Sequence, residues 1–334
     1  MSHLRSYHGT GLIPRASGAA VAALKARAAM WEAPLVEDDA GLSLFVWGSE
    51  LRLTRQADAL RIDLLAPEDR LVGILRDSAT EILAEAGVAV AWDGVTAGAL
   101  APGLALLRVA GVSRLVPGFL RVRLSGAKAG QFAQGGYHFR LLLPPAGRTA
   151  VWPRVAASGR TVWPDGDDTL HRPVYTVVGH GPGWLDFDIF CHPGSPTCDW
   201  AQGAPVGQLV GAIGPGGGGC PEGDRLWLFG DQTAMPAITR MLAETRGTVR
   251  AVLCCDAADL GALADDPRVT RCDDLMAALQ AMPDPAGGHV WFAADTARAR
   301  AARAHLSGLG LTKAQFTTAA YWTRADAREE TGPA

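Results

Sequence analysis

The alternation of apolar and polar positions divides the chain into three stretches. In the first, an Ala-rich helix is expected over 17–31, and a second helix with an apolar stripe is expected to begin at Pro67 and end at Gly87. Helix, strand meander and helix together predict a small α+β domain over residues 1–100. The strands of this domain are expected over 42–47, 51–54, 60–65 and 88–92.

The second stretch, residues 104–220, has apolar runs separated by Gly and Pro, which are typical of an antiparallel barrel or sandwich. A polar segment over 146–170 contains Trp152 and Trp163. It is long for a hairpin loop and is expected to be either a flexible insertion or a functional flap. One helical turn is expected over 197–201. The strands are expected over 106–112, 119–124, 137–143, 174–178, 184–191 and 209–213.

In the third stretch, residues 224–327, apolar runs alternate with helical patterns. This alternation predicts a parallel sheet with helices on both faces, in which ligands bind outside the carboxyl ends of the strands. The strands are expected over 226–229, 249–254, 289–293 and 315–320, and the helices over 234–244, 260–264, 274–281 and 296–309. The segments 230–233 and 254–256 and Asp295 are therefore expected at the ligand-binding edge.

Composition and charge narrow the classes of protein. The 334 residues carry a net charge of −3 and are 48% hydrophobic, which indicates a globular chain of several domains without the basic surface of a nucleic-acid-binding protein. The sequence has no run of eighteen apolar residues, so no membrane-spanning helix is expected, and no signal peptide is evident. The six cysteines form no Cys-x-x-Cys pair, which favours a reducing cytoplasm over a disulfide framework or a metal site.

The segment Leu226–Arg240 combines a buried strand, a tight polar turn and a helix with Pro236 in its first turn. This arrangement points backbone N–H groups at an anion, commonly a phosphate. An ordinary βα unit with a polar turn would show the same pattern, so the segment alone leaves both interpretations open.

Several short motifs follow one another in a specific order. They are Tyr175-Thr176 after Arg172, the blocks 186–192 and 196–201, Gly214-Pro215, Gly-Asp-Gln-Thr-Ala-Met-Pro-Ala over 230–237, and Tyr321-Trp322. In this order they resemble the siderophore-interacting proteins, which are FAD-containing ferric-siderophore reductases of the ferredoxin–NADP reductase superfamily. The resemblance covers about residues 104–327. The first hundred residues resemble a small domain of unknown function.

The resemblance implies a multi-domain fold: the N-terminal α+β domain, then an antiparallel β-barrel FAD domain, then an α/β doubly wound nucleotide-binding-like domain. It also implies a role for each matching residue. The expected FAD-binding residues are Arg172, Tyr175, Thr176, Val177, Phe190, His192, Thr197, Cys198, Trp200 and Thr233. The expected nucleotide-donor residues are Gly230, Asp231, Thr233, Ala234 and Pro236. Basic residues expected to guide an anionic chelate are His138, Arg140, Arg172 and Arg324.

The chain departs from the family pattern at three places. Arg172 stands three residues before Tyr175 rather than two, and Val178 occupies the position of a trailing arginine. Cys198 replaces a serine expected near the FAD pyrophosphate. The basic residue after Tyr321-Trp322 is displaced by one, to Arg324. These departures weaken the basic contacts expected for the FAD phosphates and the substrate.

The resemblance predicts an enzyme that uses FAD to reduce a ferric siderophore and release ferrous iron. NAD(P)H or a ferredoxin would supply the electrons. No side chain is expected to act as a catalytic acid or base, because flavin accepts a hydride and passes on single electrons. Two alternatives stay open: a flavin-dependent reductase of another acceptor, such as a quinone or a redox protein, and a non-catalytic sensing or docking protein with a degenerate FAD site. The valine at position 178 favours the last.

Overall fold

The computed structural model describes residues 5–15, 18–283, 285 and 287–323. The chain forms two compact units. The first unit comprises Met1–Ala105, Leu142–Arg172 and Gly211–Ile213, and the second unit comprises Leu106–Leu141, Pro173–Val210 and Gly214–Ala334. No helix of the described residues is long and apolar enough to cross a bilayer.

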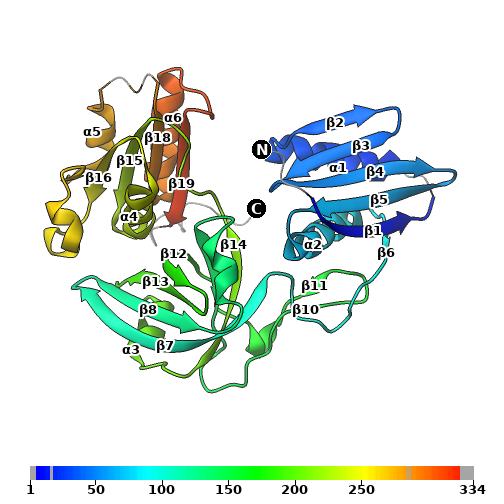
Figure 1. Ribbon diagram of the computed structural model, residues 1–334, viewed down its shortest axis with the longest axis horizontal. Helices are drawn as coiled ribbons and strands as arrows, with labels where there is room; N and C mark the ends of the chain where they lie inside the picture. Colours follow the sequence, from blue (N-terminus) through cyan, green and yellow to red (C-terminus); the bar gives the residue numbers. More distant parts are fainter. Residues whose placement is uncertain (1–4, 16–17, 284, 286, 324–334) are drawn as a thin grey trace. The chain divides into compact units, whose positions relative to one another are not determined.

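The N-terminal domain is a six-stranded sheet in the order β2-β3-β4-β5-β1-β6, with both helices on one face (Figure 1). Alternate residues of β4 and β5 are buried, and Leu53, Ile62 and Leu64 meet Leu24 of α1 and Leu75 of α2 in one core. The elements are β1 (Tyr7–Ile13), α1 (Gly18–Trp31), β2 (Leu35–Asp38), β3 (Gly41–Val46), β4 (Ser49–Gln56), β5 (Ala59–Ala66), α2 (Asp69–Glu85) and β6 (Ala91–Trp92).

Strand β1 was not expected from the sequence, and neither was β2. β1 contains two glycines, which weaken a strand signal because they have no side chain to pack. The structure explains both glycines by close approach. A Cβ atom at Gly9 would lie 2.7 Å from Val72 Cγ1, and one at Gly11 would lie 2.7 Å from Trp92 Cε3. The packing of α2 and β6 against this strand therefore requires glycine.

The segment over 146–170 belongs to the first unit and is attached to the N-terminal domain, so the expectation of a flexible insertion is wrong, whereas the functional flap stays a prediction. It forms the hairpin of β10 (Arg154–Val155) and β11 (Thr161–Val162). The backbone N–H of Thr161 donates to Asp77 Oδ1 at 2.7 Å, and Arg160 Nη2 lies 2.9 Å from Glu81 Oε1. Both carboxylates are on α2, which therefore holds the hairpin.

The central strands form the predicted closed antiparallel barrel, in the order β12-β13-β8-β7-β14-β9 (Figure 1). Its core includes Phe132, Phe139 and Phe187, whose rings pack edge to face with centroids 5.7 and 5.3 Å apart. The elements are β7 (Leu104–Val116), β8 (Phe119–Ser125), the 3₁₀ turn η1 (Ala129–Ala133), β9 (His138–Leu142), β12 (Val174–Gly181), β13 (Trp184–Phe190), α3 (Pro196–Gln202) and β14 (Leu209–Gly216).

The C-terminal sheet is parallel, with the order β17-β16-β15-β18-β19. Helix α4 packs on the face that carries Leu226 and Leu228, and α5 and α6 pack on the face that carries Phe229 and Phe292, so helices cover both faces as predicted. The elements are β15 (Arg225–Asp231), α4 (Met235–Glu244), β16 (Thr248–Cys254), β17 (Val269–Arg271), α5 (Leu275–Gln280), β18 (His289–Asp295), α6 (Thr296–Gly308) and β19 (Phe316–Trp322).

Two details of the C-terminal domain differ from the sequence-based expectation. The helix expected over 260–264 is a 3₁₀ turn, η5 (Gly261–Asp265). The short edge strand β17 was not expected, because three residues are too few to show a periodic pattern.

Candidate functional site

The strand order of the C-terminal sheet reverses between β15 and β18, and the carboxyl ends of these two strands are Asp231 and Asp295. Such a reversal is where open α/β sheets bind their ligands. The polar turn expected to meet the donor nucleotide therefore lies at the position that the topology favours.

Gly230 allows this turn to be tight. A Cβ atom there would lie 2.6 Å from Ala234 Cβ and 2.7 Å from Ile238 Cδ1, so only glycine lets the start of α4 pack on the end of β15. Ala234 is buried, and Pro236 occupies the first turn of α4, where its missing N–H costs little. Among the described residues, the N-cap residue Ala234 gives α4 no side-chain cap. Gly230, Ala234 and Pro236 thus shape the expected donor site through the backbone.

Asp231 is fully buried, and its carboxylate holds the turn from within. Oδ1 accepts from the Thr233 N–H at 2.9 Å and from Thr233 Oγ1 at 2.6 Å. Oδ2 accepts from the indole N–H of Trp322 at 2.8 Å. Asp231 therefore joins β15 to the end of β19, while Thr233 is only half-buried.

Tyr321 makes a second connection from β19, this time to the barrel. Its hydroxyl lies 2.8 Å from Nε2 of His138 on β9, and the two rings pack edge to face. Burial and the nearby Arg240 lower the pKa of His138. Burial, and then the charge of Asp231, raise the pKa of Tyr321. A neutral imidazole whose Nε2 accepts a hydrogen bond from the neutral phenol of Tyr321 fits both directions.

Sequence reasoning missed a further contact between the barrel and the C-terminal domain. Arg240 on α4 donates to the carbonyl oxygen of Val177 at 3.0 Å and lies over the Tyr137 ring, 4.1 Å from its centroid. Glu244 accepts from Arg240 Nε at 2.8 Å and from the Tyr137 hydroxyl. The i,i+4 spacing of Arg240 and Glu244 predicts their ion pair, but nothing local in the sequence indicates the barrel residues that they meet.

Tyr175 lies on β12, half-buried, with its ring centroid 5.0 Å from that of the buried Phe187. Burial raises the pKa of Tyr175 to about 12, and a hydrogen bond with the Thr197 side chain opposes the rise. The structure therefore brings together Tyr175 and Thr197, which are far apart in sequence. Thr176 is buried beside Tyr175 and is paired with His138 in the β12–β9 register.

The connection from β13 to α3 carries the remaining barrel residues of the expected FAD site. Phe190 is half-buried, and His192 is exposed and stacked on it, with ring centroids 6.2 Å apart. Cys198 is 3% exposed, and its N–H donates to the Ser195 hydroxyl at 3.3 Å. Trp200 is half-buried and donates to Gln208 Oε1 at 2.7 Å.

These groups are of the chemical kinds that could hold a flavin dinucleotide. A half-buried phenol offers a face for a flat ring, while Thr176 and Thr197 are buried beside it and Thr197 shares a hydrogen bond with it. Gly194 has a φ of +76°, and a Cβ atom there would meet nothing within 4 Å, so the backbone before α3 leaves room for a ligand. Val177 contributes differently, because its side chain is fully buried and its N–H donates to Tyr137 O at 2.8 Å.

The basic residues expected to guide the substrate are in different situations. His138 is engaged with Tyr321. Arg140 is exposed on β9, opposite Val174 of β12. Arg172 is exposed, with its guanidinium carbon 4.8 Å from the centroid of the Trp163 ring. Arg324 lies outside the described residues. The described residues contain no group of three or more His, Cys, Asp or Glu side chains that could hold a metal ion.

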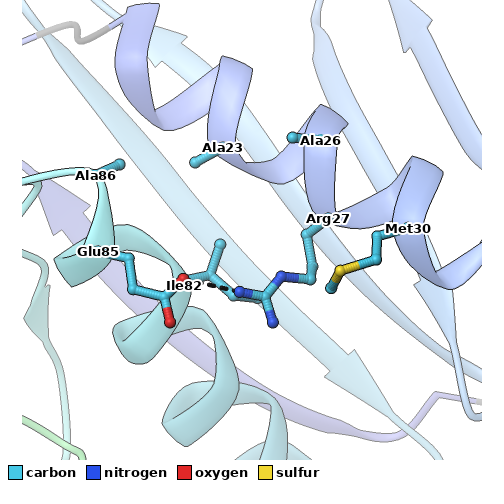
Figure 2. A pocket seen from close by; sticks show the side chains of 7 residues that line it. All are labelled: Ala23, Ala26, Arg27, Met30, Ile82, Glu85 and Ala86. Atoms are coloured by element: carbon cyan, nitrogen blue, oxygen red, sulfur yellow. Dashed lines mark hydrogen bonds and ion pairs between the residues drawn. The ribbon is translucent and has the colours of Figure 1, made fainter. Parts of the chain in front are cut away.

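Two cavities lie apart from these residues. One, of about 280 Å³, lies between α1 and α2, and Figure 2 shows the ion pair of Arg27 and Glu85, 2.8 Å apart, that joins its walls. The other, of about 180 Å³, lies on the barrel beside Arg121 and Arg123. Asp188 and Asp186 pair with these arginines at 2.8 and 2.7 Å, so their charges are already matched.

Comparison with protein families finds two matches. Residues 108–219 match the model of the siderophore-interacting FAD-binding domain, and residues 223–325 match that of the siderophore-interacting protein. The NADPH-dependent ferric-chelate reductase of Escherichia coli is 33% identical over 143 residues, which are 41% of this chain and 55% of the relative. The ferric vibriobactin reductase ViuB of Vibrio cholerae is 32% identical over 133 residues, 37% of this chain and 47% of the relative. The chain thus spans about half the length of the curated relatives it matches.

Solved structures agree in fold. A siderophore utilization protein from T. fusca is 26% identical, with a TM-score of 0.54 over 69% of this chain and 96% of that one. The siderophore-interacting protein SipS from Aeromonas hydrophila is 20% identical, with a TM-score of 0.55 over 68% of this chain and 95% of that one, and shows the shared fold alone.

Proposed function

The chain belongs, through residues 108–219 and 223–325, to the siderophore-interacting protein family, and on that premise we propose that it is an FAD-dependent oxidoreductase that reduces ferric siderophores and releases ferrous iron. The observation that carries the proposal is that family motifs distant in sequence meet in space. Tyr321 and Trp322, adjacent on β19, contact His138 of the barrel and Asp231 of the donor turn. The same strand end thus connects the two domains that would hold FAD and its donor.

The barrel residues would hold the flavin. Tyr175 would stack on the ring, with the Thr176 hydroxyl near its reactive edge. Thr197, at the start of α3, would lie near the pyrophosphate, with His192 beside the cofactor and Trp200 covering it. When bound, FAD accepts a hydride and passes on single electrons. The protein's own contribution would be to orient the ring.

The C-terminal domain would admit the donor at the Gly230–Thr233 turn. The buried Asp231 fixes the turn, and the half-buried Thr233 is the side chain available to a nucleotide. NAD(P)H is the proposed donor, supported by the position of the turn at the strand-order reversal and by the NADPH named for the Escherichia coli relative. A ferredoxin is the alternative donor.

The chemistry follows from the metal. Hard oxygen donors hold ferric iron tightly and ferrous iron far less tightly, so one added electron releases the metal. Many ferric chelates are anionic, and we propose that Arg140 and Arg172 attract them. No side chain needs to take a proton from the chelate.

We further propose three domains, residues 1–100, 104–220 and 224–327, since the two family matches, residues 108–219 and 223–325, nearly coincide with the last two ranges. The cytoplasm is the proposed location, supported by the six cysteines, all of which are free thiols.

One departure from the family pattern favours a second function, a docking or sensing protein with a degenerate FAD site. The position of the family's trailing arginine is Val178, which cannot contact a phosphate. The absorption spectrum of the protein reconstituted with FAD separates the two proposals, because only the enzyme retains flavin bands after gel filtration.

The activity test is ferrous-chelator trapping of iron from ferric siderophores, with NADH, NADPH or reduced ferredoxin as the donor. Retained flavin with iron release supports the reductase. Retained flavin without iron release, but with reduction of a quinone, would assign a different acceptor. A protein that retains no FAD would contradict both reductase proposals.

A further inference from the structure

Two cysteines lie together where β13 ends and α3 begins. Cys191 follows the last residue of β13, and Cys198 is in the first turn of α3. Cys198 Sγ lies 3.3 Å from the carbonyl oxygen of Phe190, which belongs to the peptide bond that precedes Cys191. Cys191 Sγ lies 3.8 Å from the carbonyl oxygen of Ile189. The two sulfur atoms are therefore directed at neighbouring peptide groups of the same strand end.

The electrostatics of the Cys191 thiol agree with this placement. Burial raises the pKa of the Cys191 thiol. The charge of Cys198, and a hydrogen bond between the two thiols, raise this pKa further, whereas Arg114 lowers it. After burial, the charges of Cys198 and Cys191 also raise the pKa of Tyr175. Both thiols are thus close to the aromatic residue that would stack on the flavin.

The intervening loop is built to keep the two thiols close. Pro193 and Pro196 restrict its backbone, and Gly194 takes the positive φ of the turn. The Ser195 hydroxyl accepts the N–H of Cys198, which fixes the first turn of α3. The loop therefore brings Cys191 and Cys198, seven residues apart in sequence, close together in space. Both cysteines are free thiols.

We propose that Cys191 and Cys198 are a modification site, a pair of thiols that form a reversible disulfide and thereby lower the affinity of the barrel for FAD. The disulfide itself depends only on this chain. Its effect on FAD rests on the proposed function.

The disulfide would act on the flavin site through Thr197. To bond with Cys191, the Cys198 sulfur must leave the Phe190 carbonyl and approach to about 2.05 Å of its partner. Thr197 is the residue before Cys198, is 2% exposed, and shares a hydrogen bond with Tyr175. A shift of the first turn of α3 therefore strains the contact that positions the Tyr175 ring.

The oxidation balances with a peroxide as the oxidant. The half-buried Cys191 thiol must first lose its proton to water, which its raised pKa makes slow and the neighbouring Arg114 favours. The thiolate then attacks a peroxide oxygen and becomes a sulfenic acid, and the other peroxide oxygen leaves as water after taking up a proton. The Cys198 thiol then attacks that sulfur, and a second water leaves. Two thiols and one H₂O₂ give one disulfide and two waters. A dithiol reductant reverses the step by exchange.

Such a site has a chemical rationale in an enzyme that releases ferrous iron. Ferrous iron and peroxide together generate hydroxyl radicals. A site that peroxide itself oxidises, with loss of FAD, would stop iron release when the product is most harmful.

The test uses the full chain, treated with H₂O₂ or with dithiothreitol and then alkylated. Mass spectrometry of the non-reduced digest should show a peptide pair joined through Cys191 and Cys198 in the oxidised sample only. The dissociation constant of FAD, from the quenching of flavin fluorescence, should rise about tenfold on oxidation, which corresponds to the loss of roughly one hydrogen-bonded contact. Dithiothreitol should restore it.

Two variants make the test specific. Cys191→Ser should bind FAD as the reduced wild type does and should no longer respond to peroxide. Cys254→Ser is the matched control, because Cys254 also has a thiol neighbour, Cys272. Burial, and then the charge of Cys254, raise the pKa of the Cys272 thiol to about 11. This variant should keep the full response.

The absence of the joined peptide would overturn the proposal, whatever the protein does with FAD. A joined peptide with an unchanged FAD affinity, or a response that survives in Cys191→Ser, would overturn the switch. If the reduced wild type binds no FAD, the proposed function fails, and the joined peptide still decides whether the thiol pair is a modification site.

Discussion

Replacing Trp322 with Phe removes the indole N–H that donates to Asp231 Oδ2 at 2.8 Å. Asp231 is fully buried in the wild type, so its carboxylate depends on donors from the chain. The carboxylate keeps its two contacts with Thr233 but loses the one that ties β15 to β19. The variant therefore tests whether this buried contact stabilises the donor turn.

The magnitude follows from the charge of the acceptor. A hydrogen bond to a charged group contributes about 1.5–3 kcal/mol to stability, and a buried acceptor left without its partner loses that amount. The smaller Phe ring also destabilises the protein through the side-chain volume that it removes. The same substitution at a second tryptophan measures this volume effect separately. The indole N–H of Trp227 on β15 is buried and has no hydrogen-bond partner in the part of the chain that the structure describes.

Trp227→Phe is thus the matched control, because it changes the same side chain without breaking a hydrogen bond. Urea unfolding followed by far-UV circular dichroism should show that Trp322→Phe lowers the free energy of unfolding by at least about 1.5–3 kcal/mol more than Trp227→Phe, because Trp227→Phe also removes a buried N–H that has no partner among the described residues. Equal losses in the two variants would refute the reasoning, since the Asp231 contact would then contribute nothing beyond packing.

Four further predictions address the cofactor, donor, substrate and pH. Tyr175→Ala should weaken FAD binding by about 0.5–1.5 kcal/mol beyond the area lost, measured by fluorescence titration, whereas Tyr175→Phe should retain the stacking; equal affinities in all three proteins would contradict the assigned stacking. Thr233→Trp should lower kcat/KM for NAD(P)H about tenfold or more with FAD still bound, and unchanged donor kinetics would place the donor elsewhere. In the Arg140→Gln/Arg172→Gln protein, the KM for an anionic ferric chelate should rise about tenfold at low salt, with kcat nearly unchanged. This increase in KM should shrink at high salt, and an equal increase at both salt concentrations would mean that charge is not the cause. The folded-state pKa of His138 is lowered, so its contribution to stability is present above its unfolded pKa of about 6.5 and is lost as the pH falls through the folded value. His138→Gln should therefore make the midpoint of unfolding less sensitive to acid, and the same acid sensitivity in both proteins would assign the effect to other groups.

Elements with a strong periodic pattern could be predicted from the sequence, and short or glycine-containing ones could not. α2 and α4 each have an apolar stripe along most of their length, and both were expected within two residues of where they begin. β1 has glycines where α2 and Trp92 pack against it, so its strand character depends on neighbours that are distant in sequence. Its place in the sheet follows from packing rather than from local preference.

The candidate site divides in the same way. Tyr175 and Thr233 could be named from ordered motifs, and the structure places them in the barrel and at the strand-order reversal. Asp231 was expected to meet the donor, yet it is buried among Thr233 and Trp322, because a carboxylate at a strand end can cap the following turn as well as bind a ligand. The contacts of Arg240 with the barrel were not expected, since a helix pattern shows which face is apolar but not what lies opposite a charged residue.

The attachment of the 146–170 hairpin to α2 has a consequence for how the protein is made. A ribosome releases residues 1–105 well before residues 142–172, yet the first unit contains both, together with Gly211–Ile213. Until the later segments emerge, the nascent N-terminal domain presents Asp77, Glu81 and Trp92 without the hairpin that pairs with the two carboxylates and packs on the ring. Domains that are contiguous in sequence fold in order during synthesis, whereas this one finishes only after most of the barrel has left the ribosome. Translation speed between residues 105 and 213 thus sets how long that incomplete surface stays open to chaperones and to other chains.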